Sequence, residues 1–322
     1  MKKQMLPGTD LLVSSYCYGV MRFGTSAKGA AMLDLYQAWC ESGGNFFDTA
    51  HCYASWLPGG EGASERGLGE CLRHFGNRRD VVISTKGGHP AFGAAYPRPA
   101  DCMTPEVIAS DITTSLERLQ IDTIDLYTLH RDDTRHPASE IIDTLNAEIA
   151  RGRVRYIGAS NWTVERIAEA NAYASRKGLR GFVASSPQWN LVRPNHAPIA
   201  WDGSYDQTTH MMNDDDIAWH RLSGLAVMPW TPTAYGYIAG ATGRNAESFD
   251  NPVSRQRRER AGRLAKDLGC TANQVALAWL RAHAFPVFPI IGTTNMAHLR
   301  DSIGADDVVL TPAQRDWLVR DT

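Results

Sequence analysis

The sequence lacks paired cysteines, long hydrophobic runs and any strong excess of charge of one sign. Its six cysteines are scattered without a C-x-x-C pair, so we predict reduced thiols and neither a zinc site nor a disulfide framework. No window is apolar enough to cross a membrane, and residues 1–10 contain no signal-peptide core, which favours a cytoplasmic protein. The formal net charge of −2 provides no electrostatic footprint for nucleic acid.

Glycine-rich phosphate loops are also missing. No G-x-G-x-x-G follows a candidate strand in this sequence. The segment GTSAKGA, at residues 24–30, fails the P-loop pattern because Lys and Ser or Thr do not follow its second glycine. These absences argue against the common dinucleotide-binding fold and against a P-loop nucleotide site.

A regular alternation of short apolar runs and longer amphipathic segments is present instead. With 322 residues and 43% apolar side chains, the chain fits one α/β barrel or two modest domains. The eight candidate strands are residues 15–19, 45–48, 81–86, 124–130, 154–160, 181–188, 225–230 and 287–292. Because βα units form parallel sheets and no linker divides the chain, we predict a single α/β domain over residues 1–322, a (β/α)8 TIM barrel.

Two additions to the barrel are expected at its ends. Residues 5–14 are typical of a β-hairpin, with Pro7 and Gly8 turning the chain. Thr311 and Gln314 form a capping-box pattern that opens a helix after the eighth strand. The fold prediction therefore includes an N-terminal hairpin and an additional C-terminal helix.

Other helices have legible start signals. Thr104 followed by Pro105 precedes one apolar helical face, and Ser64 precedes another. The arginine-rich run at residues 255–260 is expected to be the solvated start of a further helix rather than a site for polyanions.

Four polar residues of different kinds lie at or just beyond the ends of predicted strands. They are Asp48, Tyr53, Lys86 and His130. In a (β/α)8 barrel the carboxyl ends of the strands meet at one mouth, where active sites are built. We therefore expect these four side chains to converge there.

Together these groups suit proton transfer to a carbonyl oxygen. The Tyr53 hydroxyl can donate a proton as a general acid. A nearby Lys86 ammonium is expected to lower the tyrosine pKa from about 10, with Asp48 as its ion-pair partner. His130 can donate a hydrogen bond that orients the substrate oxygen.

Five short motifs in order resemble the aldo-keto reductase superfamily over nearly the whole chain. They are FDTAHCY at 47–53, STKGG at 84–88, DLYTLH at 125–130, GASNW at 158–162 and SPQWN at 186–190. In this match Asp48, Tyr53, Lys86 and His130 occupy the family's catalytic tetrad without substitution. The resemblance implies NAD(P)H-dependent reduction of an aldehyde or ketone to an alcohol, with sugar-type carbonyls among the candidates.

The same resemblance implies a set of cofactor-binding positions. Ser160, Asn161 and Gln188 match residues that hydrogen-bond the carboxamide of the nicotinamide. Trp230 matches an aromatic residue that stacks on the nicotinamide ring. The remaining implied positions are Asp48, Thr231, Pro232, Gly236, Arg244, Gly292, Thr293, Thr294, His298 and Ser302.

Two of these cofactor segments depart from the family pattern. Ala241 stands where many relatives have a pyrophosphate-binding lysine, although Arg244 is close by in the sequence. Gly292 and His298 replace the Lys or Arg that often surrounds a 2′-phosphate, and Ser302 replaces a usual Asn. We therefore expect NADPH as the cofactor, with a reduced preference over NADH.

Substrate contacts are expected from long loops after the strands, at residues 54–63, 87–103 and 190–214. Tyr53, Trp56, His130 and Trp162 are the predicted substrate-binding residues. Aromatic faces beside hydrogen-bonding groups weakly favour sugar-like or polyol-like carbonyl compounds, and a hydrophobic aldehyde also fits.

Two other functions compete with hydride transfer. Some relatives with this fold bind cofactor and serve as regulatory subunits, and the intact tetrad argues for catalysis over that role. A metal-dependent barrel hydrolase is less favoured, because it leaves Lys86 and Tyr53 unexplained. Its candidate ligands are His51, His130, Asp132, Asp133 and His136.

Overall fold

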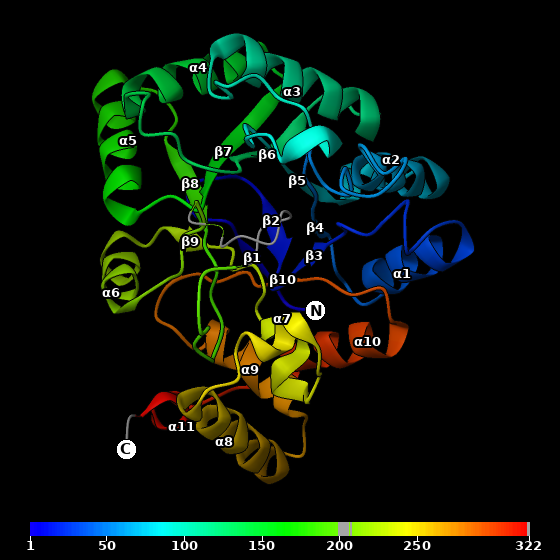
Figure 1. The fold of residues 1–322 in the computed structure, drawn as a ribbon, viewed down its shortest axis with the longest axis vertical. Helices are drawn as coiled ribbons and strands as arrows, with labels where there is room; N and C mark the ends of the chain where they lie inside the picture. The colour runs from blue at the N-terminus through cyan, green and yellow to red at the C-terminus, as the bar shows by residue number, and fades with distance from the viewer. Residues whose placement is uncertain (199–205, 207, 321–322) are drawn as a thin grey trace.

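A parallel sheet of eight strands forms the centre of the protein (Figure 1). The computed structural model describes residues 1–198, 206 and 208–320. In spatial order the strands are β10 (Ile290–Ile291), β3 (Cys17–Gly19), β4 (Phe46–Asp48), β5 (Val82–Gly87), β6 (Ile124–Leu129), β7 (Val154–Ser160), β8 (Phe182–Ser186) and β9 (Ala226–Val227). All eight overlap the predicted strands.

Backbone hydrogen bonds close the sheet into a barrel. Val227 of β9 donates to Pro286 O at 2.9 Å and accepts from Phe288 N at 2.8 Å. Ile290 N at the start of β10 donates to Pro229 O at 3.0 Å. The predicted (β/α)8 barrel is thus confirmed.

The seventh and eighth barrel strands are shorter than the sequence predicts. Six-residue strands were expected at 225–230 and 287–292, whereas β9 and β10 each contain two residues. Prolines 229 and 289 lie inside the expected strands. Proline has no backbone N–H to donate to a ladder, so regular pairing ends beside it.

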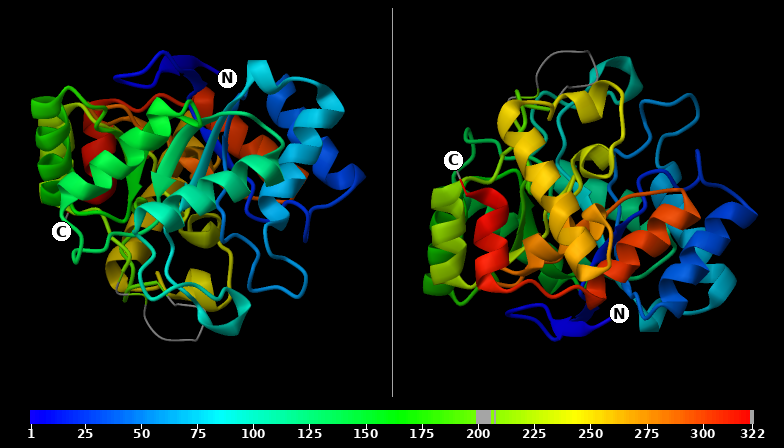
Figure 2. Two further views of the ribbon diagram at one scale, coloured as in Figure 1. Left: turned by 90° about the horizontal axis from the view of Figure 1, so that it is seen from above. Right: turned by 90° about the horizontal axis from the view of Figure 1, so that it is seen from below.

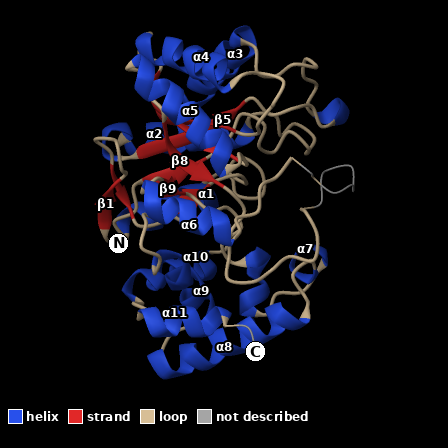
Figure 3. Ribbon diagram, turned by 90° about the vertical axis from the view of Figure 1, so that its left-hand side faces the viewer, coloured by secondary structure: helices blue, strands red, loops and turns tan. Residues whose placement is uncertain are grey.

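Helices surround the sheet on its outer side (Figures 1 and 3). They are α1 (Ala30–Glu41), α2 (Ala63–Phe75), α3 (Pro105–Leu119), α4 (Ala138–Ala150), α5 (Val164–Lys177), α6 (Asp214–Ser223), α7 (Arg244–Glu247), α8 (Pro252–Leu268), α9 (Ala272–Arg281), α10 (Met296–Gly304) and α11 (Pro312–Val319). Ile112 of α3, Leu145 of α4 and Ile157 of β7 belong to one buried cluster that joins the two layers. Each such side chain stabilises the fold by about 1.5–3 kcal/mol. Among the described helices, none is long and apolar enough to cross a membrane.

The N-terminal hairpin is confirmed. Strands β1 (Lys3–Met5) and β2 (Leu12–Ser14) pair antiparallel. Gly8 has φ of 72°, which the turn requires and glycine adopts without strain. The hairpin lies at the end of the barrel opposite α7 (Figures 2 and 3). Its Leu6 packs with Phe46 and Phe288 and fills that end.

The predicted C-terminal helix is α11, and its Thr311–Gln314 capping box is present. Thr104 caps α3 as predicted, with Pro105 in the first helical turn. The expected role of Ser64 is wrong. Helix α2 already begins at Ala63, and the Ser64 hydroxyl instead donates to Val20 O at 2.8 Å.

The arginine-rich run is not the solvated helix start that we expected. It lies inside α8, and Arg257 and Arg260 are buried. Arg257 donates to Leu191 O at 3.0 Å and Arg260 to Trp317 O at 3.2 Å. The run therefore joins α8 to α11 and to the segment after β8.

Candidate active site

The four residues of the expected tetrad meet at the carboxyl ends of neighbouring strands. Asp48 ends β4, Lys86 lies near the end of β5, and His130 directly follows β6. Tyr53 lies in the loop after β4. Lys86 Nζ is 2.5 Å from Asp48 Oδ2 and 3.1 Å from Tyr53 OH. The ring centroids of Tyr53 and His130 are 5.6 Å apart.

Lys86 is buried and uses its donors fully. Its ammonium group has three N–H donors. They bind Asp48 Oδ2, the Thr49 carbonyl at 2.9 Å and Tyr53 OH. Ser84 donates a further hydrogen bond to Asp48 Oδ1 at 3.1 Å. Since Asp48 and Lys86 are 2% and 3% exposed, removal of either partner leaves an uncompensated buried charge.

Burial corrects one expectation about Tyr53. Desolvation raises the pKa of Tyr53 to about 12, and the Lys86 ammonium offsets only part of that rise. The predicted net lowering below 10 is therefore wrong, although Lys86 acts in the predicted direction. Burial alone would lower the pKa of Lys86, but Asp48 and Tyr53 together raise it above its ordinary value. Tyr53 is a neutral phenol that bears a proton to donate.

His130 is held as a neutral imidazole. Burial, with His89 and Arg131 nearby, lowers its pKa well below 6.5. Its Nδ1 lies 3.5 Å from the Cys52 sulfur. Burial raises the pKa of Cys52 to about 12, so this sulfur is a thiol. When its S–H donates to Nδ1, the imidazole proton lies on Nε2, which is then a hydrogen-bond donor.

The residues expected to hold nicotinamide form a second polar group beside the tetrad. Asn161 Nδ2 donates to Ser160 Oγ at 3.0 Å, and Trp230 Nε1 donates to Asn161 Oδ1 at 3.2 Å. Asn161 also donates to the His130 carbonyl at 3.1 Å. Within the described chain, the buried Gln188 Oε1 accepts no hydrogen bond. A bound carboxamide N–H would satisfy it, so these residues fit a nicotinamide.

The expected positions after β9 lie in a tightly turned loop. Thr231 has φ of 55° and Gly236 has φ of 83°, and Pro232 lies between them. Arg244 begins α7, and its side chain is exposed to solvent. Ala241 N donates to Gly236 O at 3.0 Å. Arg244 remains available for a phosphate group.

The expected positions after β10 lie at the start of α10. Tyr18 OH donates to Thr293 O at 2.8 Å and so fixes the turn that carries Gly292 and Thr294. His298, in the first turn of the helix, is exposed. Ser302 differs, because it is buried and its hydroxyl accepts from Asn273 of α9 at 3.3 Å.

Asn295 is a residue of this region that sequence reasoning missed. Its Oδ1 accepts hydrogen bonds from Ala297 N at 2.8 Å and His298 N at 3.1 Å, which caps α10. An Asn directly before a helical segment is a recognised start signal and could have identified it.

Aromatic residues line the loops beside Tyr53, but Trp162 is not among them. The ring centroids of Trp56 lie 6.5 Å from Tyr53 and 6.1 Å from Phe92. Trp162 is 2% exposed, packs against Phe182 and donates its N–H to the Arg131 carbonyl. Trp162 therefore belongs to the buried hydrophobic core and not to the surroundings of the tetrad.

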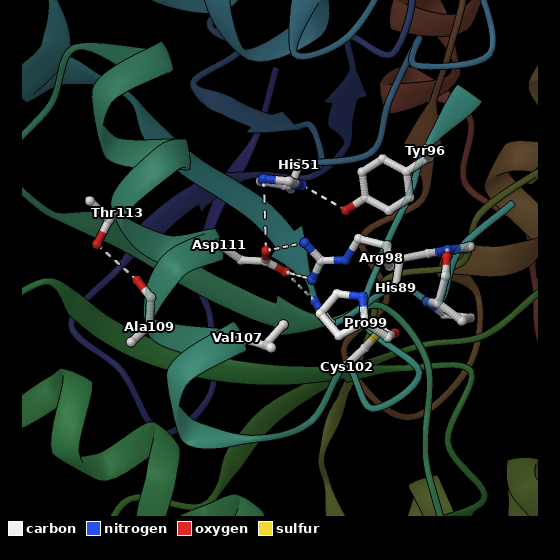
Figure 4. Close-up of polar contacts among 12 residues, drawn as sticks. His51, His89, Tyr96, Arg98, Pro99, Cys102, Val107, Ala109, Asp111 and Thr113 are labelled. Atoms are coloured by element: carbon white, nitrogen blue, oxygen red, sulfur yellow. Dashed lines mark hydrogen bonds and ion pairs between the residues drawn. The ribbon is translucent and has the colours of Figure 1, made fainter. Parts of the chain in front are cut away.

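A second unforeseen feature anchors the loop between β5 and α3 (Figure 4). Arg98 binds both oxygens of Asp111 at 2.7 Å, and Gly88 N donates to Asp111 Oδ2 at 2.9 Å. Tyr96 OH lies 2.6 Å from His51 Nδ1. The sequence signal was Asp111 itself, a carboxylate on the apolar face of a predicted helix, where a buried partner is required.

Comparison with known families decides what this site belongs to. Residues 16–318 match the model of the Aldo/keto reductase family. The chain belongs to this family. It is an oxidoreductase, and the earlier resemblance is confirmed.

Individual relatives of this aldo/keto reductase extend over nearly all of it. An uncharacterized oxidoreductase, YrpG, of Bacillus subtilis is 30% identical over 96% of this chain and 92% of that protein. A probable voltage-gated potassium channel subunit beta of Arabidopsis thaliana is 27% identical over 98% of this chain and 95% of its own. The structure of a thermostable aldo-keto reductase, Tm1743, in complex with epalrestat, matches with a TM-score of 0.73 at 20% identity, over 99% of this chain and 98% of that one. This last likeness supports the fold.

The ligand set considered for a metal hydrolase is divided in this aldo/keto reductase. Asp132 pairs with Arg166 at 3.3 Å, and His136 pairs with Asp101 at 2.9 Å. His51 Nδ1 lies 2.6 Å from Tyr96 OH, and the ring of His130 lies beside that of Tyr53. The five candidates do not surround one point.

Acid is expected to destabilise the fold through His89, beside His130. Burial and Arg131 lower the pKa of His89 to about 4, from the ordinary 6.5 that it regains on unfolding. Between these two pKa values the unfolded chain binds more protons than the folded chain does. The free energy of unfolding is therefore highest above pH 6.5 and falls as the pH falls toward 4. Urea midpoints at about pH 7 and about pH 5 measure this loss, and His89→Gln should show a smaller one. An equal loss in the variant would contradict the assignment.

Proposed function

We propose that this chain, acting as one catalytic domain, reduces the carbonyl group of a small aldehyde or ketone to an alcohol with NADPH. The observation that carries the proposal is the Lys86 ammonium held between the Asp48 carboxylate and the Tyr53 hydroxyl, at 2.5 Å and 3.1 Å. A cytoplasmic location accords with the six free cysteines.

The cofactor, when bound, supplies a hydride to the carbonyl carbon. Ser160, Asn161 and Gln188 would hold the carboxamide of its nicotinamide ring, and Trp230 would cover the ring face. The unsatisfied Gln188 Oε1 is the observation that supports this placement. NADPH remains the expected cofactor, with NADH as the alternative.

The proton of the reduction comes from Tyr53. Its neutral hydroxyl donates to the carbonyl oxygen, and the phenolate that remains is stabilised by the adjacent Lys86 ammonium. Asp48 keeps that ammonium in place. In the reverse reaction the same phenolate would act as the base.

His130 orients the substrate oxygen. Its neutral Nε2–H donates a hydrogen bond and carries no charge that would compete with Lys86 for the developing phenolate. Trp56 and Phe92 border this position and supply apolar faces, which suit the faces of a sugar or an aryl aldehyde. A panel of aldoses, ketoses and aryl aldehydes, followed by loss of reduced-cofactor absorbance, identifies the class.

The second candidate is a cofactor-binding regulatory subunit. It is favoured by the similarity over 98% of this chain to the potassium channel subunit beta of Arabidopsis thaliana. Tight cofactor retention without turnover of any carbonyl in the panel would support this candidate over the reductase.

Tyr53→Phe is expected to lower kcat for carbonyl reduction by about two to four powers of ten, because the ring remains and the proton donor is lost. The dissociation constant of the reduced cofactor, measured by fluorescence titration, should stay nearly unchanged. Near-normal turnover in the folded variant would remove Tyr53 from this role.

Replacement of His298 tests the proposed 2′-phosphate position. His298→Arg should favour NADPH over NADH in kcat/KM by about one to two kcal/mol, since guanidinium forms charge-assisted bonds with phosphate. His74→Arg, at an exposed histidine of α2, adds the same group elsewhere and should leave the ratio unchanged. An unchanged ratio in both variants would show that His298 does not face the 2′ position.

A further inference from the structure

Three side chains that ligate transition metals gather at the barrel mouth. Cys52, His89 and His130 each offer one ligand atom, and these atoms lie within 4.8 Å of one another. They come from the segments after β4, β5 and β6. The imidazole rings of His89 and His130 are 4.8 Å apart and nearly perpendicular, at 79°. Two imidazoles and a thiol form a donor set typical of zinc sites.

The distance between Cys52 Sγ and His130 Nδ1 already matches the distance between two ligand atoms of a tetrahedral zinc ion. Cys52 Sγ and His130 Nδ1 are 3.5 Å apart. A tetrahedral ion with Zn–S of about 2.3 Å and Zn–N of about 2.0–2.1 Å places its sulfur and nitrogen ligands about 3.5 Å from each other. The ion can therefore replace the thiol proton between these two atoms with little movement of either side chain.

His89 is prepared as the third ligand by its own backbone contact. Its Nδ1 lies 2.7 Å from the Pro90 carbonyl. A carbonyl only accepts, so Nδ1 carries the proton and Nε2 keeps a lone pair. Histidine ligands usually donate their second ring N–H to such an oxygen, which fixes the tautomer and the ring orientation.

The loop that carries His89 is anchored close to the cluster. Asp111 accepts from Gly88 N, the residue before His89, and binds Arg98 with both oxygens (Figure 4). Phe92 and Tyr96 of the same loop stack with centroids 4.7 Å apart. These contacts reduce the entropy that would be lost when an ion orders the three ligands.

We propose that Cys52, His89 and His130 form a binding site for a zinc-class divalent ion, and that occupation of this site blocks the reductase. The ion takes Sγ, Nδ1 of His130 and Nε2 of His89, and the thiol proton passes to solvent. Water completes the coordination. Nε2 of His130 keeps its proton, so the block comes from the ion and its bound water, which occupy the space beside His130 and Tyr53 where the substrate oxygen has to lie; the centroids of these two rings are 5.6 Å apart.

No ligand spacing in the sequence indicates this cluster, because its members come from three separate loops. Harder ions such as Mg²⁺ and Ca²⁺ prefer oxygen ligands and should not bind here. A second group, Asp101, Asp133 and His136, also places its ligand atoms within 4.8 Å of one another. It contains no sulfur, which allows the two groups to be distinguished by spectroscopy.

The test uses the full chain, freed of metal with a chelator and titrated with Co²⁺ in the absence of substrate. One equivalent should produce a thiolate-to-cobalt charge-transfer absorption, and Zn²⁺ should remove it by displacement. Cys52→Ala should abolish the band, and His89→Gln should weaken Co²⁺ binding at least about tenfold. Cys102→Ala and His136→Ala are the matched controls and should retain both band and affinity.

Zn²⁺ inhibition is measured in parallel. Wild type and His136→Ala should be inhibited at the same Zn²⁺ concentration, while His89→Gln should require at least about ten times more. A thiolate band that survives in Cys52→Ala, or an affinity unchanged in His89→Gln, overturns the site. If Cys52→Ala fails to fold, His89→Gln alone decides. Because cobalt absorption needs no turnover, failure of this proposal is distinguishable from failure of the proposed reductase function.

Discussion

The buried ion pair between Lys86 and Asp48 is the constraint on which the site depends. It lies on adjacent strands, so the barrel itself sets its 2.5 Å geometry. A lone ammonium at this depth would carry a large desolvation cost, and the carboxylate offsets that cost. The third donor of Lys86 is left for Tyr53, and this bond fixes where the phenol hydroxyl lies. Loss of the Lys86–Asp48 pair would therefore change the position of the Tyr53 hydroxyl, the charge beside it and the pKa of Tyr53 together.

Burial determines the chemistry of the groups around this pair. It raises the pKa of Tyr53 to about 12 and lowers that of His130 well below 6.5, so both are neutral. The Lys86–Asp48 pair then stands among neutral hydrogen-bond donors, and its ammonium faces the Tyr53 hydroxyl, where it stabilises the developing oxyanion. The same burial leaves Cys52 as a thiol against His130, the contact on which the proposed metal site is built.

Residues that end apolar runs could be predicted from the sequence, because parallel strands bring their carboxyl ends to one mouth. Asp48, Lys86 and His130 are of this kind. The wrong or missing predictions for the site, namely Trp162, the Arg98–Asp111 pair and the pKa of Tyr53, have separate physical causes. Asn161 adopts φ of 61° and turns the chain, and the next residue, Trp162, lies in the packing. The Arg98–Asp111 pair joins a loop to a helix; the apolar helix face indicates that Asp111 needs a partner, but no local pattern identifies Arg98 as that partner. The net pKa of Tyr53 depends on its burial, which composition does not reveal.

A double-mutant cycle tests the central claim, that Asp48 acts through Lys86. It compares kcat/KM for carbonyl reduction in Lys86→Met, Asp48→Asn and the double variant, each corrected for folded protein by circular dichroism. Each single variant is expected to lose about two powers of ten or more in kcat/KM, and the double variant should lose little beyond Lys86→Met. Losses that multiply in the double variant would contradict the claim, because Asp48 and Lys86 would then act independently.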